Sequence, residues 1–297
     1  MNQSATITIV CVCDNHYAML LAALIKSIEA NHHTPEKLEF YIVDDNISKK
    51  NRLKLSASIN ADTTTIHWKP MRDCIPKGTV LPTDKSSSPL NIYVRLFIPF
   101  FVSPGTERVI FLDVDMIMLE DISKLWYTDL QTNIVGAVQD QFIQIVSRWG
   151  GISNYEQFGY TKDSKYFNAG LMLMDIKKWQ ANDISNKVLK CLAENKEHAQ
   201  FQDQYGLNAI LGHHWLELDP LWNRFAYSED KNPYLIHFTG RKPIYETYNF
   251  SEDYREIFLS YLRQTAWTTY KPIGETRRYL KKFTNILQKA RNLIPRK

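Results

Sequence analysis

Residues 7–43 read ITIVCVCDNHYAMLLAALIKSIEANHHTPEKLEFYIV. The apolar, β-branched start at residues 7–12 predicts a strand, residues 20–28 repeat apolar side chains at helical spacing, and residues 40–43 predict a second short strand. A strand, a helix and a strand in this order form a βαβ unit, which implies a parallel sheet with a right-handed crossover. The chain is therefore predicted to be an α/β protein.

Strand and helix patterns continue through most of the 297 residues, a length that suffices for one large α/β domain. Residues 76–89 contain Gly78, Pro82 and three successive serines, and this composition predicts a loop. We predict one main domain over residues 1–270 and a separate tail over residues 271–297. The further predicted elements are helices at 49–58, 92–101 and 184–193, and strands at 64–68, 108–112, 135–138, 170–174 and 234–238.

The predicted strand at 108–112 runs into two carboxylates, Asp113 and Asp115, with Val114 between them. Residues two apart at the end of a strand project to one side, so both side chains can approach one hard divalent cation. In open α/β sheets, ligands bind outside the carboxyl ends of the strands, where this sequence places the pair. The motif predicts a cation that bridges the phosphates of a nucleotide-diphosphate donor and neutralises charge on the leaving group.

His237, at the end of the last predicted strand, is the candidate third ligand. Gly240 follows it and allows close backbone approach, and Arg241 and Lys242 can face phosphate oxygens. Carboxylate ligands suit Mn²⁺ or Mg²⁺, and an added imidazole favours Mn²⁺. The alternative is a purely structural histidine.

Four motifs stand in order behind the opening strand and its Asp14 turn: Asp113-Val-Asp115, Tyr166-Phe-Asn-Ala-Gly-Leu-Met-Leu-Met174, Gln202-Asp-Gln204 and His237-Phe-Thr-Gly240. Together they resemble the retaining glycosyltransferase family 8 over about residues 7–267. That family includes bacterial α-galactosyl- and α-glucosyltransferases of lipopolysaccharide or lipooligosaccharide synthesis, and the glycogenins. The resemblance implies a GT-A type, Rossmann-like nucleotide-sugar-binding domain with a mixed, mainly parallel sheet, and UDP-galactose or UDP-glucose as donor.

The resemblance also assigns contacts with the nucleotide sugar. Val12 and Asp14 would contact the uracil ring, His16 the ribose, and Arg95 the donor sugar or diphosphate. Asp14 as a helix cap and Arg95 with a structural acid partner are the alternatives. The other residues implied to bind the donor are Val114, Asn168, Ala169, Gly170 and Gly240.

Asp203 and Gln204 match the family's pair beneath the anomeric carbon, although such a stretch by itself would indicate an exposed helix start. Retention requires either a double displacement through an enzyme nucleophile or a same-face substitution through a short-lived ion pair. Gln204 is an amide and a poor nucleophile, so we favour same-face substitution, in which a β-phosphate oxygen takes the acceptor proton. Asp203 then orients the sugar, Gln204 stabilises positive charge, and Lys242 helps to hold UDP.

The four cysteines, Cys11, Cys13, Cys74 and Cys191, do not have the spacing of a zinc site or a disulfide framework. We expect reduced core thiols and a cytoplasmic protein. The first residues show no signal-peptide pattern, and no stretch approaches the roughly 18 apolar residues of a membrane span.

The tail has eight basic residues from Arg277 onward and no acidic one. Removing these eight from the 36 Lys and Arg leaves 28 against 32 Asp and Glu, a net charge of −4, which disfavours a nucleic-acid-binding body. From Tyr279 the apolar residues recur at 3–4 spacing, which predicts an amphipathic helix on an anionic membrane surface, at the inner face of the cytoplasmic membrane. A helix docked on the body is the alternative. The expected acceptor is a saccharide, lipid-linked in view of this tail.

Two other functions fit parts of the sequence. A phosphohydrolase of the haloacid dehalogenase type also begins with a strand followed by Asp-x-Asp, but here Ile117 stands where such enzymes usually have Thr or Val, and a downstream acidic pair is not evident. A membrane-docked sugar-binding protein without turnover would have no need of a leaving-group metal, so Asp113, Asp115 and His237 argue against it.

Overall fold

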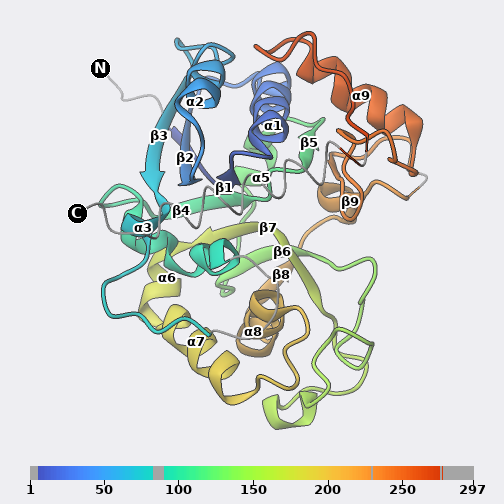
Figure 1. Cartoon of the computed structure of the whole chain (residues 1–297). Helices are drawn as coiled ribbons and strands as arrows, with labels where there is room; N and C mark the ends of the chain where they lie inside the picture. Colours follow the sequence, from blue (N-terminus) through green and yellow to red (C-terminus); the bar gives the residue numbers. More distant parts are fainter. Residues whose placement is uncertain (1–5, 83–89, 229, 275, 277–297) are drawn as a thin grey trace.

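A seven-stranded sheet forms the centre of the molecule. The computed structural model describes residues 6–82, 90–228, 230–274 and 276. The strands are β1 (Thr6–Asp14), β2 (Lys37–Asp45), β3 (Thr64–Pro70), β4 (Arg108–Leu112), β6 (Val135–Gln139), β7 (Phe167–Asp175) and β8 (Trp215–Glu217). Their order is β3-β2-β1-β4-β7-β6-β8, and all neighbours are parallel except β7, which is antiparallel to β4 and β6. This mixed, mainly parallel sheet confirms the predicted α/β class (Figure 1).

Helices cover both faces of the sheet (Figure 1). One face carries α1 (Ala18–Asn31), α2 (Lys49–Ser56) and α9 (Glu252–Leu262), and the other carries α6 (Ile176–Ala181), α7 (Ile184–Glu194) and α8 (Gln202–Leu211). Alternate strand residues enter opposite cores, as in β4, where Ile110 packs toward α1 and Phe111 toward α6 to α8. The shorter helices are α3 (Met71–Cys74), η1 (Leu90–Phe97), α4 (Ile98–Phe101), α5 (Ile122–Trp126), η2 (Tyr155–Phe158) and η3 (Pro220–Asn223).

A small three-stranded sheet joins distant parts of the chain. It consists of β5 (Met116–Met118), β10 (Leu235–His237) and β9 (Arg224–Phe225), in the order β5-β10-β9. β10 is antiparallel to β5, with His237 opposite Met116, and the Phe238 N–H donates to the Asp115 carbonyl at 2.8 Å. This ladder holds His237 beside the residues that follow β4.

Two predicted elements differ in the structure. Residues 92–101 do not form one α-helix: η1 is a 3₁₀ helix, and α4 follows it. Pro99 has no N–H to donate to the Arg95 carbonyl, so a continuous α-helix would lose a bond there. β7 begins at Phe167, three residues before the predicted start at 170, so Asn168 and Ala169 lie within a buried strand. The ends of the other predicted elements agree within three residues.

All four cysteines lie within the described residues, and each is a buried, free thiol. Burial raises the pKa of Cys74 to about 12 and of Cys191 to about 11, which keeps these thiols protonated and unreactive. The prediction of reduced core cysteines is therefore confirmed.

The predicted amphipathic helix from Tyr279 lies outside the described residues. Ile273, shortly before it, is buried and forms an isolated bridge with Tyr245. In the parts of the chain that the structure describes, no helix has the length and apolar character needed to cross a membrane.

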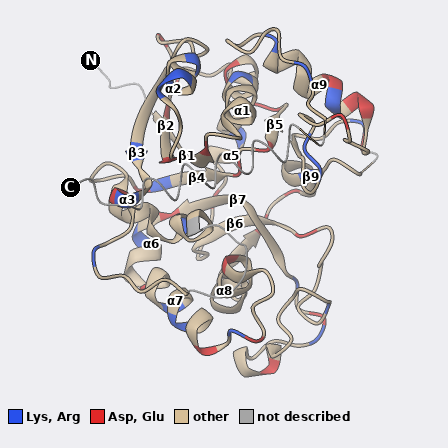
Figure 2. Cartoon of the chain, in the orientation of Figure 1, with Lys and Arg blue, Asp and Glu red and all other residues tan. Residues whose placement is uncertain are grey.

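Figure 2 shows acidic and basic residues interspersed on the body, as on α9, which carries Glu252, Asp253 and Arg255.

Asp121 connects two parts of the N-terminal half, the start of α5 and the segment after α1. Its side chain caps α5 by accepting from the Ser123 N–H at 2.9 Å, and it accepts from the His33 N–H at 2.8 Å beyond the end of α1. Burial acts to raise the Asp121 pKa, but these hydrogen bonds outweigh it and lower the pKa to about 2. We expect Asp121→Ala to lower the free energy of unfolding by about 2 kcal/mol at pH 7, because it removes a cap and leaves a buried N–H unpaired.

The stability difference between Asp121→Ala and the wild type should depend on pH in a definite direction. A carboxyl whose pKa is lower in the folded protein stabilises it above the unfolded pKa of about 4, and this contribution is lost as pH falls toward about 2. Urea unfolding of the variant and the wild type at pH 7 and near pH 2 should therefore show a gap that narrows with acid. Asp129→Ala, at an exposed aspartate that also accepts a local N–H, is the matched control. An equal gap at both pH values would contradict the assigned role.

Candidate active and metal-binding site

The predicted site residues gather at one edge of the sheet. β1, β4 and β6 run in the same direction, so their carboxyl ends bring Asp14, Asp113 and Asp140 to this edge. β7 runs in the opposite direction and begins there, with Asn168 and Ala169 in its first residues. The topology thus assembles polar groups from four separate strands.

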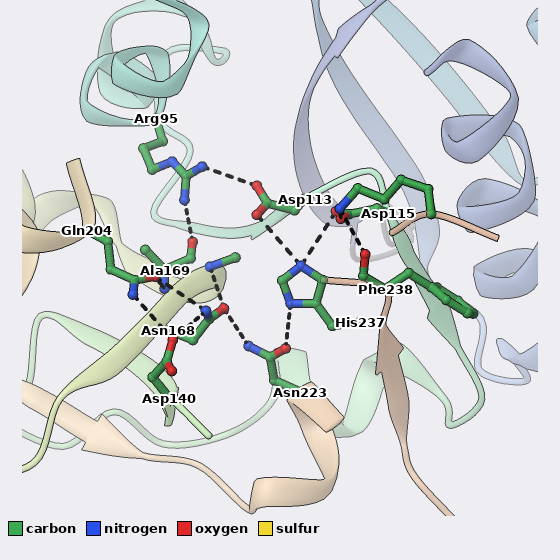
Figure 3. Close-up of polar contacts among 12 residues, drawn as sticks. Arg95, Asp113, Asp115, Asp140, Asn168, Ala169, Gln204, Asn223, His237 and Phe238 are labelled. Atoms are coloured by element: carbon green, nitrogen blue, oxygen red, sulfur yellow. Dashed lines mark hydrogen bonds and ion pairs between the residues drawn. The ribbon is translucent and has the colours of Figure 1, made fainter. Parts of the chain in front are cut away.

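Asp113, Asp115 and His237 form a cluster that could hold a cation. Each offers one ligand atom, and these atoms all lie within 4.8 Å of one another. His237 Nε2 lies 3.5 Å from Asp115 Oδ1 and 4.0 Å from Asp113 Oδ2 (Figure 3). Two carboxylates and an imidazole are a ligand set suited to Mn²⁺ or Mg²⁺. The structure therefore brings the three predicted ligands together.

Gly170 gives this cluster its space. A Cβ at this position would lie 2.7 Å from His237 Cε1 and 2.9 Å from both Asp113 Oδ2 and Asn168 Oδ1. The space that a side chain at position 170 would fill is therefore taken by two of the candidate ligands, His237 and Asp113, and by the Asn168 amide. This close approach, which the sequence indicated through glycine at 170, fits a site whose ligands must converge on one point.

The charges of the two aspartates are balanced by two cations. Lys242 forms an ion pair with Asp115, and Arg95 forms one with Asp113 at 3.1 Å. Burial raises the pKa of Asp113, with Arg95 opposing the rise. For Asp115 burial acts in the same direction, but Lys242 and His237 outweigh it and hold the Asp115 pKa well below its usual range. Asp115 is thus the more strongly ionised ligand.

Arg95 links three parts of the site. Its guanidinium pairs with Asp113 and, at 3.0 Å, with Asp203, and it donates to the Ala169 carbonyl at 2.6 Å. The guanidinium carbon lies 4.4 Å from the centre of the Phe111 ring, a cation–π distance. Burial raises the Asp203 pKa, and Arg95 opposes that rise. The alternative for Arg95 was a structural role with an acid partner. Arg95 does have acid partners, Asp113 and Asp203, and both belong to the predicted site.

Gln204 lies at the start of α8, next to the first residues of β7. Its Oε1 accepts from the Ala169 N–H at 3.0 Å and from Asn168 Nδ2 at 3.3 Å. Its Nε2 donates to Asp140 Oδ2 at 3.3 Å. Gln202 and Asp203 are buried, so this helix start is not the exposed one that its sequence alone would indicate.

Val12, Asp14 and His16 lie at the end of β1. Asp14 Oδ1 accepts from the N–H groups of His16 at 2.8 Å and Tyr17 at 3.1 Å, so it stabilises the turn into α1. His16 is buried, with Nε2 2.5 Å from the Tyr245 hydroxyl. Val12 is partly buried, and Val114 is buried in the core beneath the aspartates. Their contacts with a nucleotide remain predictions.

Gly240 ends the short segment after β10. Its φ of +71° lies in the left-handed region, which favours glycine, and this turn leads the chain to Lys242. Lys242 Nζ also donates to the Phe238 carbonyl at 2.8 Å. The turn therefore returns the lysine to the candidate ligand Asp115.

Sequence reasoning missed Asp140 and Asn223. Asp140 follows β6 as directly as Asp113 follows β4, so the rule that polar groups collect at strand ends would have found it. Asn223 closes η3, and its Oδ1 lies 2.9 Å from His237 Nδ1. A single asparagine after Pro220-Leu-Trp gives no signal in the sequence.

Comparisons with known proteins show the family and the fold of the chain. Residues 8–243 match the model of glycosyl transferase family 8. General stress protein A of Bacillus subtilis is 28% identical over 293 residues, covering 91% of this chain and 97% of that protein. Glycosyltransferase GlyF of Streptococcus pneumoniae is 26% identical, covering 88% of this chain and 62% of its own length. The galactosyltransferase LgtC, solved with donor and acceptor sugar analogues, shares the fold with a TM-score of 0.72 and 24% identity, covering 89% of this chain and 100% of that one. The chain belongs to glycosyl transferase family 8.

Proposed function

We propose that this glycosyltransferase moves a hexose, galactose or glucose, from a UDP-sugar to a saccharide acceptor with retention of configuration and with Mn²⁺ as the metal. The observation that carries the proposal is the convergence of Asp113, Asp115 and His237 within 4.8 Å, beside Lys242 and Arg95. Such a group of cations and ligands would stabilise a departing diphosphate, and a protein that only binds sugar has no leaving group to stabilise.

The chain's own residues would divide the work at the donor. Asp113, Asp115 and His237 hold the cation, which would neutralise the charge that develops on the departing diphosphate. Lys242 can exchange its partner Asp115 for a phosphate oxygen, because its flexible stem carries a compact charge. Asn168, Ala169 and Gly170 would hold the donor sugar, as the resemblance to the family implies.

The mechanism that this arrangement favours is same-face substitution. Gln204 presents an amide, which is a poor nucleophile, and Asp203 is engaged by Arg95 at 3.0 Å. The Arg95 guanidinium thus holds the Asp203 carboxylate, which is not free to attack the sugar. In this mechanism Asp203 orients the donor sugar. A covalent glycosyl adduct trapped on Asp203 would show double displacement instead.

Exposed aromatic residues beside the site support a saccharide acceptor. Phe142, Trp149 and Phe201 are exposed by 57%, 68% and 42%, and the ring of Trp149 stands edge to face against the other two at 6.3 and 5.8 Å. The Phe142 N–H donates to Asp140, and Phe201 directly precedes α8 with Gln204. Aromatic faces offer apolar contact area for sugar rings.

We expect Trp149→Ala to raise the acceptor KM by about tenfold, the equivalent of about 1.4 kcal/mol, with little change in the donor KM. Initial rates at varied acceptor and donor concentrations measure the two effects. Trp215→Phe, at a partly buried ring on β8, is the control for loss of an indole. Equal rises in both KM values would indicate general damage and contradict an acceptor role.

The setting we propose is lipopolysaccharide or lipooligosaccharide synthesis, on a lipid-linked acceptor at the cytoplasmic face of the membrane. Support comes from the eight basic residues from Arg277 onward, which would attract anionic lipids. Deleting residues 275–297 should release the protein from anionic vesicles. Unchanged partitioning would contradict the proposed membrane role of the tail.

The test of the proposed function is release of UDP from a panel of UDP-sugars by the purified full chain, with Mn²⁺, with Mg²⁺ and with EDTA. We expect turnover of one UDP-hexose that EDTA abolishes and Mn²⁺ restores. Binding of UDP-sugars without turnover, even with saccharide acceptors present, would favour a sugar-binding protein. Turnover in EDTA would exclude the proposed metal role.

A further inference from the structure

A continuous chain of hydrogen bonds runs from Asp140 to the candidate ligand His237 (Figure 3). Asp140 Oδ2 accepts from Asn168 Nδ2 at 2.9 Å, and Asn168 Oδ1 accepts from Asn223 Nδ2 at 2.9 Å. Asn223 Oδ1 lies 2.9 Å from His237 Nδ1. Asp140, Asn168, Asn223 and His237 are all buried, and we call them the amide relay.

Two fixed groups set the direction of every bond in the amide relay, the Asp140 carboxylate and the Gly170 N–H. A carboxylate only accepts, so the NH₂ group of Asn168 must face it. Asn168 Oδ1 then faces the other way, where it accepts from Asn223 and from the Gly170 N–H at 3.0 Å. Asn223 therefore turns its oxygen toward His237, and Nδ1 must carry the hydrogen. Nε2 is then the nitrogen that can present a lone pair to a cation held by Asp113 and Asp115.

We propose that Asp140, together with the Gly170 N–H, sets the tautomer of His237 through Asn168 and Asn223, which makes Asp140 and Asn223 positioning residues for metal binding. Only an unprotonated ring nitrogen binds a metal, and the partner of the other nitrogen determines which one that is. Because the amide relay is buried, water cannot easily replace a misdirected bond. This inference rests on the proposed metal site.

Asp140 is itself held rigidly, and it serves the catalytic amide as well. Its Oδ1 accepts from the N–H groups of Phe142 and Ile143, both at 2.8 Å. Its Oδ2 accepts from Gln204 Nε2 at 3.3 Å in addition to Asn168. One carboxylate therefore orients the metal-binding side and the sugar-facing side of the site together.

Asp140→Asn tests the amide relay with almost no change in shape. The two backbone N–H groups require an oxygen at the Oδ1 position, so the new NH₂ group takes the place of Oδ2. It then faces the NH₂ groups of Asn168 and Gln204. If these amides rotate, their NH₂ groups lie against the N–H groups of Gly170 and Ala169, so no arrangement of the variant satisfies every donor and the original orientation loses its advantage. Reversal passes through Asn223 to His237, whose Nδ1 then faces a donor. We expect His237 to shift toward the Nε2–H tautomer.

The experiment has two readouts besides turnover. Long-range ¹H–¹⁵N spectra of metal-free protein with ¹⁵N-labelled histidine report the tautomer, with the His237 signals identified by their loss in His237→Gln. Titration of Mn²⁺ alone, followed by electron paramagnetic resonance, reports affinity. We expect Asp140→Asn to weaken Mn²⁺ binding about 10- to 100-fold, as loss of an outer partner does in other metal sites.

Two further variants keep the inference falsifiable. Asn223→Leu removes the direct partner of His237 and should weaken Mn²⁺ similarly, even if Asp140→Asn does not fold. Asn154→Ser, at a buried asparagine that joins Asn195 and Tyr205 away from the site, is the matched control and should leave the His237 tautomer unchanged. An unchanged tautomer with Mn²⁺ affinity within twofold in Asp140→Asn or Asn223→Leu would overturn the proposal. The spectra need no metal, so a wild type that does not bind Mn²⁺ would refute the proposed function while the tautomer still tested the amide relay.

Discussion

Asp115→Asn is expected to lower kcat/KM for the UDP-sugar donor by about 10³-fold, with the loss mainly in kcat. Both carboxylate oxygens are committed: Oδ1 faces His237 Nε2 at 3.5 Å, and Oδ2 pairs with Lys242. Asparagine supplies one neutral oxygen and turns an NH₂ group toward the lysine or the imidazole. Loss of several kcal/mol of charge stabilisation at the leaving group corresponds to about this factor in rate.

Steady-state rates across a Mn²⁺ titration measure this effect. Asp163→Asn makes the same chemical change at an exposed aspartate and should leave kcat/KM unchanged. Recovery of wild-type turnover at high Mn²⁺ would mean that Asp115 only raises metal affinity. A rate within threefold of wild type at all Mn²⁺ concentrations would remove Asp115 from the proposed site.

The second large effect is expected from Gly170→Ala, which adds one methyl group. That carbon would lie under 3.0 Å from His237, Asp113 and Asn168, so at least one of them must move. Metal sites do not tolerate displaced ligands well, and we expect turnover to fall about 100-fold or more, with weaker Mn²⁺ binding. The free energy of unfolding should fall by only about 1–3 kcal/mol, the usual cost of overpacking.

Gly136→Ala provides the matched control, because Gly136 lies on the adjacent strand β6. Its added carbon would approach Leu130 Cδ2 at 2.9 Å and Leu218 Cδ2 at 3.2 Å, the far ends of flexible apolar side chains. We expect a comparable loss of stability with nearly normal turnover. Similar turnover in the two variants would show that the crowding at 170 has no special connection with the site.

The N-terminal half of the fold could be predicted from local patterns. The βαβ unit of β1, α1 and β2 and the strand β4 have strong apolar periodicity, and the structure confirms each. β5 could not be predicted, because Met116-Ile-Met118 becomes a strand only through its pairing with β10 far along the chain. α9 was missed as well, although its acidic first turn and the helical spacing of its buried residues Tyr254, Phe258 and Leu262 are a helix pattern.

The site was predicted where a motif implied chemistry and missed where geometry alone creates a role. Asp113, Asp115 and His237 belong to patterns that indicate ligands, and the structure places them together. Asn223 takes its role from a contact with His237 that no local pattern encodes. The two ion pairs of Arg95 could not be predicted for the same reason. The sequence identifies Arg95 as a cation, but only the fold brings Asp113 and Asp203 to its guanidinium.

The pairing of β10 with β5 determines when the metal site can exist during synthesis. His237 lies 122 positions after Asp115, and at about 5–20 residues per second the ribosome needs roughly 6–24 s to cover that distance. A growing chain therefore exposes two aspartates long before the histidine arrives, and full cation affinity belongs to the finished protein. Since a ligand that binds only the native state stabilises it, cation supply would govern the lifetime of the enzyme in the cell as well as its rate.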